Sequence, residues 1–82
     1  MAEQKFELEL AKRISDGTES GRIKTKNGQT VRIVAWDVKG LYPLAGLIDG
    51  GEYENINLWT NEGKTDFRFG FHSPFDLIIE TD

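Results

Sequence analysis

The first part of the chain follows a helical pattern. Phe6, Leu10 and Ile14 recur every four positions, so they lie on one side of an α-helix. The apolar residues between Phe6 and Leu10 also alternate as in a β-strand, but the neighbouring alanine and charged residues favour the helix. We therefore expect a short helix over residues 3–16. It ends at Asp16-Gly17, because glycine readily takes the position after a last helical turn.

From residue 21 to residue 71 the pattern changes to short apolar segments separated by turns that contain glycine. Closely spaced segments of this kind are typical of an antiparallel β-meander. Five strands are expected, at residues 21–26, 29–37, 42–49, 53–60 and 64–71. A closing apolar segment within residues 73–80 follows a turn at Ser73-Pro74.

The turn between the first two predicted strands determines which of their side chains share a face. A three-residue loop over residues 26–28 places Ile23 opposite Val31. It also places Lys24 opposite Thr30, whereas a two-residue turn would mix charged residues into both faces. The sequence therefore predicts the three-residue loop, with its last residue, a glycine, in the left-handed conformation of a bulged turn.

The same reasoning applies to the last predicted hairpin. A two-residue turn at residues 62–63 pairs Leu58 with Phe67. It also pairs Ile56 with Phe69, and a four-residue loop gives the same register. A three-residue loop would instead set these apolar residues opposite charged ones. We therefore expect Ile56 and Leu58 on the buried face and the residues that alternate with them on the exposed face.

The second and third predicted strands carry apolar residues on both faces, so each face needs a cover. A sheet that curls into a small SH3-like or OB-like barrel covers one face from within and has no free edges. We expect the N-terminal helix to cover the other face, over Val34, Trp36 and Leu47. The predicted fold is one mainly β (α+β) domain over residues 1–82, a five-stranded antiparallel meander with one short N-terminal helix.

Composition excludes several kinds of site. The chain has 82 residues, no cysteine and one histidine, which excludes a disulfide, a thiolate zinc site and a cysteine nucleophile. Only carboxylates remain as metal ligands, and no calcium-loop spacing is present. No signal peptide or membrane-spanning segment is found, and a chain without cysteine suits a reducing compartment. We therefore expect a cytoplasmic protein without a membrane partner.

The sequence offers no complete catalytic constellation. His72 could act as a base with Asp76 as its orienting carboxylate, but no serine lies in the strand–turn–helix setting of a nucleophile. Phosphate-binding glycine motifs are also missing, because the glycines are spaced as turn residues. We therefore expect neither enzyme activity nor a cofactor nor a metal.

One face of the last predicted hairpin has the composition of a recognition surface. The expected register exposes aromatic, amide and guanidinium groups there: Tyr53, Asn55, Asn57, Trp59 and Arg68. Aromatic rings supply rigid contact area, and amides adapt their hydrogen bonds to a partner. The leading hypothesis is a non-catalytic protein-interaction module whose protein partner the sequence does not identify. The alternative is that Trp59 covers the barrel mouth or packs on the closing segment.

Charge is unevenly distributed along the chain, whose net charge is −4. The first hairpin region is basic, and Arg22, Lys24 and Arg32 lie together in the expected register. Arg22 faces Arg32 there, a repulsion that an anionic ligand, Glu52 or Glu54 would offset. The alternative function is therefore a small β-barrel that binds nucleic acid through this basic patch. The protein is expected to be a monomer or to self-associate weakly through a sheet edge.

Residues 23–33 follow the pattern T-[RK]-[DN]-G-x-x-V-R-I. Further matching positions are Asp37, Tyr42-Pro43-Leu44, Gly46-Leu47-Ile48, Trp59-Thr60, Glu62-Gly63-Lys64, Ser73 and Asp76-Leu77. Together they resemble small uncharacterised proteins found in phages and mobile elements of gut bacteria, over roughly residues 6–80. The resemblance implies a small, β-rich, cytoplasmic accessory protein and brings no activity, cofactor or catalytic residue with it.

Overall fold

A computed structural model describes residues 2–68, 70 and 72–81. Within them the chain forms one short helix and six strands, and the strands make two antiparallel sheets of three strands each. The prediction of a mainly β fold with one short N-terminal helix is confirmed.

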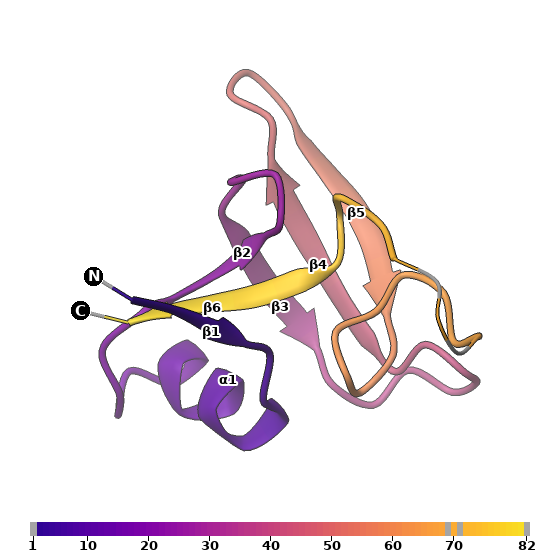
Figure 1. The fold of residues 1–82 in the computed structure, drawn as a ribbon, viewed down its shortest axis with the longest axis horizontal. Helices are drawn as coiled ribbons and strands as arrows, with labels where there is room; N and C mark the ends of the chain where they lie inside the picture. Colours follow the sequence, from indigo (N-terminus) through magenta and orange to yellow (C-terminus); the bar gives the residue numbers. More distant parts are fainter. Residues whose placement is uncertain (1, 69, 71, 82) are drawn as a thin grey trace.

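The first sheet joins the two ends of the chain. Its strands are β1 (Ala2–Lys5), β2 (Arg22–Thr25) and β6 (Leu77–Thr81), in the order β1-β6-β2. Figure 1 shows the N-terminal and C-terminal strands side by side, because β6 pairs with β1 on one side and with β2 on the other. The sequence did not predict β1, since its four residues are all exposed and show no apolar alternation.

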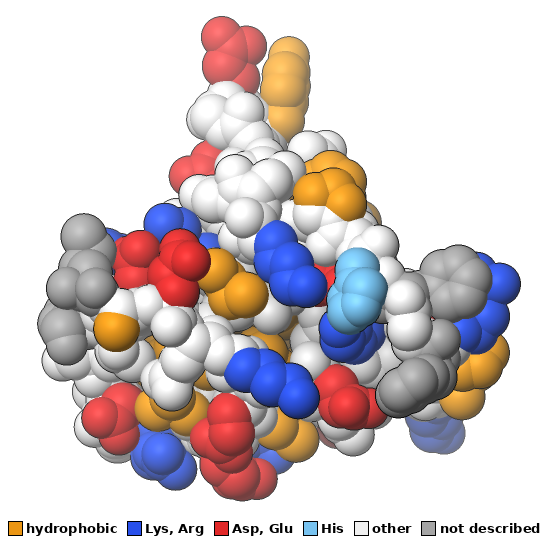
Figure 2. Space-filling view, in the orientation of Figure 1, with side chains coloured by type: hydrophobic (Ala, Val, Ile, Leu, Met, Phe, Trp, Pro, Cys, Tyr) orange, Lys and Arg blue, Asp and Glu red, His pale blue; other side chains and the backbone are white. Residues whose placement is uncertain are grey.

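The second sheet holds β3 (Val31–Ala35), β4 (Leu44–Asp49) and β5 (Glu54–Trp59), in that order. Each of these strands lies within a predicted one, so this part of the predicted meander is confirmed. The turn between β4 and β5, located in Figure 1, stands out from the body of the molecule in Figure 2, which has the same orientation. The strand order places β5 at an edge of the sheet.

Helix α1 (Leu8–Ser15) is capped at both ends. The carboxylate of Glu7 accepts a hydrogen bond from the N–H of Leu10 at 2.8 Å. Gly17 follows the C-cap residue Asp16 with a φ of 85°, so the predicted end of the helix is confirmed. The predicted start is wrong, because the chain before the helix pairs with β6 as strand β1.

The turn between β2 and β3 has the predicted three-residue loop. Lys24 pairs with Thr30, and the N–H of Thr25 donates to the carbonyl of Gln29 at 2.8 Å. Gly28 has a φ of 95°, which suits the left-handed position of a bulged turn. The bridge links the two sheets, but no pairing among the described strands closes them into a barrel, so the predicted barrel is not confirmed.

Residues 64–71 were expected to form a strand, and their described part does not. The N–H of Thr60 donates to the carbonyl of Lys64 at 2.8 Å, which closes a tight turn immediately after β5. The carbonyl of Gly63 then accepts a hydrogen bond from the N–H of Leu77 at 2.7 Å. The chain is therefore drawn toward β6 instead of returning along β5.

The predicted pairing of Leu58 with Phe67 is wrong for the same reason. Phe67 packs edge-on against the ring of Tyr42, with ring centroids 6.3 Å apart. The predicted partner of Ile56, Phe69, lies outside the described residues. Within the described part of the chain, no further strand covers β5.

The predicted orientation of β5 is also wrong. Trp59 is fully buried, whereas Ile56 is 71% exposed and Leu58 is 41% exposed. Trp59 pairs with Leu44 and points inward, and because side chains alternate, Ile56 and Leu58 point outward. Burial of the indole removes more apolar surface from water than burial of an isoleucine, so this register is the more stable one once no strand lies beyond β5.

The core draws on both sheets and on the helix. Its buried apolar residues are Phe6, Ala11, Ile23, Val31, Ile33, Leu44, Ile48, Trp59, Leu77 and Ile79. A Cβ atom on Gly46 would lie 3.1 Å from Cζ3 of Trp59, so glycine at this strand position leaves room for the indole.

Helix α1 packs on this core through Leu10 and Ile14, with Trp36 beside them. The ammonium group of Lys12 lies 5.9 Å from the centroid of the Trp36 ring, within range of a cation–π interaction. Val34 is exposed, so the expectation that the helix covers it is wrong.

Candidate functional site on strand β5

Strand β5 has a free edge. Its register with β4 runs from the Asp49–Glu54 pair to the Leu44–Trp59 pair, and no other described strand pairs with it. The unpaired side of an edge strand presents backbone N–H and C=O groups to which another strand can bond. β3 forms the other edge of this sheet and adjoins β2 at the Lys24–Thr30 bridge, so β5 is the edge that no other described strand adjoins.

The hairpin tip determines which backbone groups of β5 are free. The N–H of Gly50 donates to the carbonyl of Tyr53 at 2.9 Å, so these two residues form a hydrogen-bonded pair. Bonded and non-bonded pairs alternate along an antiparallel ladder. The odd-numbered residues of β5 therefore bond β4, and the even-numbered residues point their N–H and C=O groups away from the sheet. These even-numbered residues are Glu54, Ile56 and Leu58.

The other end of β5 agrees with this assignment. The N–H of Thr60 points away from β4 and donates to Lys64. Pro43 lies opposite Thr60, one position beyond the last strand pair, and has no N–H to offer. The free edge thus extends from Glu54 to Leu58 and ends where the turn at Thr60 begins.

A hollow of about 560 Å³ lies along the outer side of this edge, and its lining residues are Tyr42, Ile56, Asn57, Leu58 and Thr65. Ile56 and Leu58 contribute exposed apolar surface. The ring of Tyr42 contacts the ring of Phe67 edge-on. The outer hollow is therefore mainly apolar and open to solvent.

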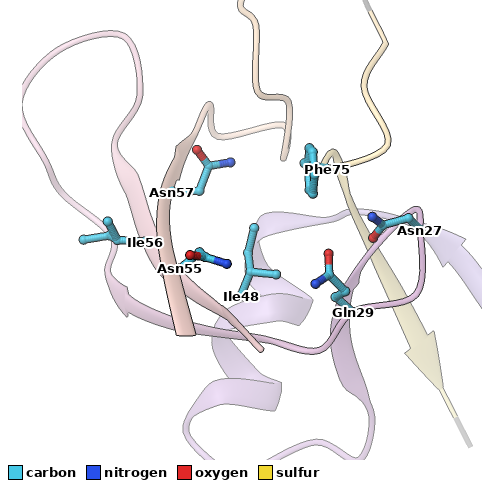
Figure 3. A pocket seen from close by; sticks show the side chains of 7 residues that line it. All are labelled: Asn27, Gln29, Ile48, Asn55, Ile56, Asn57 and Phe75. Atoms are coloured by element: carbon cyan, nitrogen blue, oxygen red, sulfur yellow. The ribbon is translucent and has the colours of Figure 1, made fainter. Parts of the chain in front are cut away.

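A second hollow, of about 500 Å³, lies on the inner side of β5 (Figure 3). It is bounded by this strand, by the β2–β3 turn and by the segment that precedes β6, and its lining residues are Asn27, Gln29, Ile48, Asn55, Ile56, Asn57 and Phe75. Figure 3 shows the side chain of Asn57 on the same side of the strand as Phe75, and Ile56 pointing away. Four carboxamides offer donors and acceptors in a lining without charge.

The aromatic side of this inner hollow is anchored in the core. The Nε1–H of Trp59 donates to the carbonyl of Phe75 at 2.8 Å, and the N–H of Phe75 donates to Oγ of Ser73 at 3.1 Å. These bonds hold the backbone of Phe75 while its side chain stays partly exposed. Trp59 therefore serves the site indirectly, by placing Phe75 opposite β5.

Two of the four amides are held by the protein, and two are available to a ligand. A threonine hydroxyl hydrogen bonds to Oδ1 of Asn27, and Nε2 of Gln29 donates to a backbone carbonyl of β4 at 3.3 Å. In the part of the chain that the structure describes, the side chains of Asn55 and Asn57 have no hydrogen-bond partner. They are the polar groups on β5 that a bound molecule would meet first.

The two hollows meet at Ile56 and Asn57, which line both of them. Together they run along both sides of the free edge, and we call them the β5 groove. One side of the β5 groove is apolar and the other carries uncharged amides.

The structure separates the residues that the sequence predicted as one binding face. Asn55 and Asn57 lie together in the β5 groove, and Tyr53 is exposed at the hairpin tip. The predicted exposure of Trp59 is wrong; it lies in one buried cluster with the closing segment, as the alternative had it. Arg68 lies beyond the turn and forms an ion pair of 2.6 Å with the aspartate two positions before it.

Ile56, Leu58 and Phe75 were not expected at this site. The sequence does carry one signal of close packing here, because Gly46 in the middle of an apolar strand marks a close approach, which the Arg32 carbonyl and the Trp59 indole both make. The position of Phe75 depends on a hydrogen bond from a residue 16 positions earlier, and no local pattern reveals such a contact.

The three basic residues of the alternative hypothesis all have acidic partners. Arg22 and Lys24 lie 3.0 Å and 3.4 Å from the carboxylate of Glu80, and the hydrogen bond from Arg22 holds the pKa of Glu80 below its usual value. Arg32 lies 3.0 Å from Glu54, one of the two acids predicted to offset its charge. The basic patch is thus largely neutralised within the chain.

The predicted pair of His72 and Asp76 is not formed as a base and its orienting carboxylate. Asp76 is buried and accepts hydrogen bonds from the N–H groups of Thr65 at 2.9 Å and Ser73 at 3.1 Å. Nδ1 of His72 lies 3.3 Å from Nζ of Lys64, and no hydrogen bond joins the two predicted partners within the described residues. Asp76 holds the segment before β6 in place.

The described residues contain no group of three or more His, Asp or Glu side chains that could hold a metal ion. No helix in the described ranges is long and apolar enough to span a membrane. Comparison of the chain with protein-family models, with curated proteins and with solved structures finds no match.

Proposed function

We propose that the protein is a non-catalytic protein-interaction module that binds its partner through the β5 groove. The observation that carries this proposal is the exposure of Ile56 and Leu58 on an edge strand. Apolar side chains beside free backbone groups favour uncontrolled strand pairing unless something covers them. A protein partner that removes both from water relieves this hazard.

The opposite edge of the molecule supports the proposal by contrast. Strand β1 is also an edge strand, and its exposed side chains include Glu3, Gln4 and Lys5. Charged residues on an edge discourage pairing with another strand. One edge of the fold is thus protected in the usual way, and the edge at β5 is not.

Nucleic-acid binding has weaker support. A phosphate group would have to displace Glu80 from Arg22 and Lys24, and Glu54 from Arg32. The inner side of the β5 groove holds no charged residue that would contact a phosphate. We therefore place the protein-binding function first.

The proposal also covers the overall architecture of the protein and its role in the cell. When the strand order is followed through the Lys24–Thr30 bridge, it becomes β6-β2-β3-β4-β5, in which the last strand of the chain, β6, lies beside β2. This order supports an SH3-like barrel as the overall architecture. From the pattern within residues 23–33 we also propose that the chain is a cytoplasmic accessory protein of a phage or mobile element.

The test compares two single lysine substitutions as baits in cells that express the protein. Ile56→Lys places a charge in the β5 groove, and Val34→Lys places one at an exposed position elsewhere in the same sheet. We expect the wild type and Val34→Lys to recover the same protein and Ile56→Lys to lose it. The purified partner should then bind Ile56→Lys at least about tenfold more weakly than the wild type.

Thermal denaturation of both variants tests whether each is folded, as we expect. Equal recovery by Ile56→Lys and Val34→Lys contradicts the assignment of the β5 groove, and so does the absence of any protein that binds the wild type.

A further inference from the structure

We propose, resting on the function above, that the partner binds as an extended segment that adds a strand to the free edge of β5. The backbone of Glu54, Ile56 and Leu58 supplies the hydrogen bonds of this added strand. The free edge has the length of a short strand and ends at the turn formed by Thr60, so it takes a short segment of a partner and not a large sheet.

The two sides of the β5 groove define which segment fits. Side chains of an added strand point alternately to the two faces of the sheet. One set therefore faces Ile56 and Leu58, and the other faces Asn55, Asn57 and the inner hollow. The matching segment alternates apolar residues with small uncharged polar residues, such as threonine, serine or asparagine, which exchange hydrogen bonds with the two available amides.

The charge at the hairpin tip determines which end of the bound segment is basic. Asp49, Glu52 and Glu54 lie at that end of β5 and are exposed. Arg32 offsets Glu54, and the described residues place no cation against Asp49 or Glu52. The end of the segment that reaches the tip therefore carries lysine or arginine.

A second copy of this chain fits the edge less well. In the antiparallel register that pairs Ile56 with itself, Leu58 of each copy would face Glu54 of the other, which sets an apolar side chain against a carboxylate. The chain also has a net charge of −4, so two copies repel each other. The occupant is therefore a segment of a different protein with a basic end.

The chain offers a substitution that blocks an added strand and removes no hydrogen bond between β4 and β5. The N–H of Ile56 points away from β4, so Ile56→Pro removes a donor that β4 does not use. Ile56→Thr is the matched control, because it also removes the apolar side chain and keeps the N–H. Circular dichroism and denaturation curves test whether both variants fold like the wild type, as we expect.

The probe is a displayed library of short random peptides, selected on the wild-type protein. We expect the enriched peptides to alternate apolar and uncharged polar residues and to carry lysine or arginine at one end. A synthetic peptide of the enriched sequence should bind Ile56→Pro at least about tenfold more weakly than Ile56→Thr. On binding, amide exchange at Ile56 and Leu58 should slow.

Three results overturn the proposal. They are equal affinity of the enriched peptide for Ile56→Pro and Ile56→Thr, the failure of any peptide to be enriched, and a dimer of the wild type in sedimentation equilibrium that Ile56→Pro abolishes. If Ile56→Lys loses its captured partner and yet no peptide is enriched, the interaction module stands and binds a folded surface. If no partner is captured either, the proposed function fails as well.

Discussion

Single side chains decide which surface of this small domain is open. Trp59 turns inward, places its indole over Gly46 and hydrogen bonds to the backbone of Phe75. That choice forces Ile56 and Leu58 outward, because neighbours on a strand alternate. The candidate site is thus a consequence of where one indole is buried.

At this scale, the ion pair of Asp66 and Arg68 gives a prediction about pH. Hydrogen bonds from Arg68 lower the pKa of Asp66 from 3.8 to about 2. We expect the carboxyl carbon of Asp66 to titrate near pH 2 in nuclear magnetic resonance spectra. In Arg68→Gln its midpoint should rise toward 3.8.

The stability effect has a defined sign. Because the pKa of Asp66 is lowered in the folded state, its contribution is present above the unfolded pKa and is lost as pH falls from about 4 toward 2. A midpoint near 3.8 in the wild type would contradict the ion pair.

At the scale of elements, β4 and β5 each carry one isoleucine that can be compared, and the two differ in exposure. Ile48 is buried and Ile56 is exposed. We expect Ile48→Ala to lower the free energy of unfolding by about 2–5 kcal/mol. Ile56→Ala should change it by less than about 0.5 kcal/mol.

Urea denaturation measures both values. A large loss of stability for Ile56→Ala, with a small one for Ile48→Ala, would mean that β5 faces the other way.

Much of the second sheet, and the turn that leads into it from β2, could be predicted from the sequence, because the signals are local. The Asn27-Gly28 turn and the apolar residues on either side of it were sufficient to assign the β2–β3 register. The same kind of reasoning was wrong for β5. It assumed that residues 64–71 return along the strand, and the turn at Thr60 connects the chain to β6 instead.

Contacts between distant parts of the chain could not be predicted from local sequence patterns. β1 forms only because the C-terminal strand lies beside it, and its own residues show no pattern. Asn55 and Asn57 were predicted as binding residues and do share the β5 groove. Phe75 joins them through a contact with Trp59 that no short-range signal reveals.

In the whole molecule, the edge strands β1 and β5 differ in the side chains that they expose. Figure 1 places α1 and both termini at one end, and the β4–β5 turn points away from them. Polar β1 lies at an edge of the first sheet, and β5, with its exposed Ile56 and Leu58, lies at an edge of the second. The charged side chains of β1 discourage pairing with another strand, and the exposed Ile56 and Leu58 of β5 do not.

The free edge of β5 is the central claim, and amide hydrogen exchange of the unbound protein tests it most directly. The N–H groups of Ile56 and Leu58 should exchange at least about tenfold faster than those of Asn55 and Asn57, which bond β4. Uniform protection along β5, or faster exchange at Asn55 and Asn57, would contradict the account.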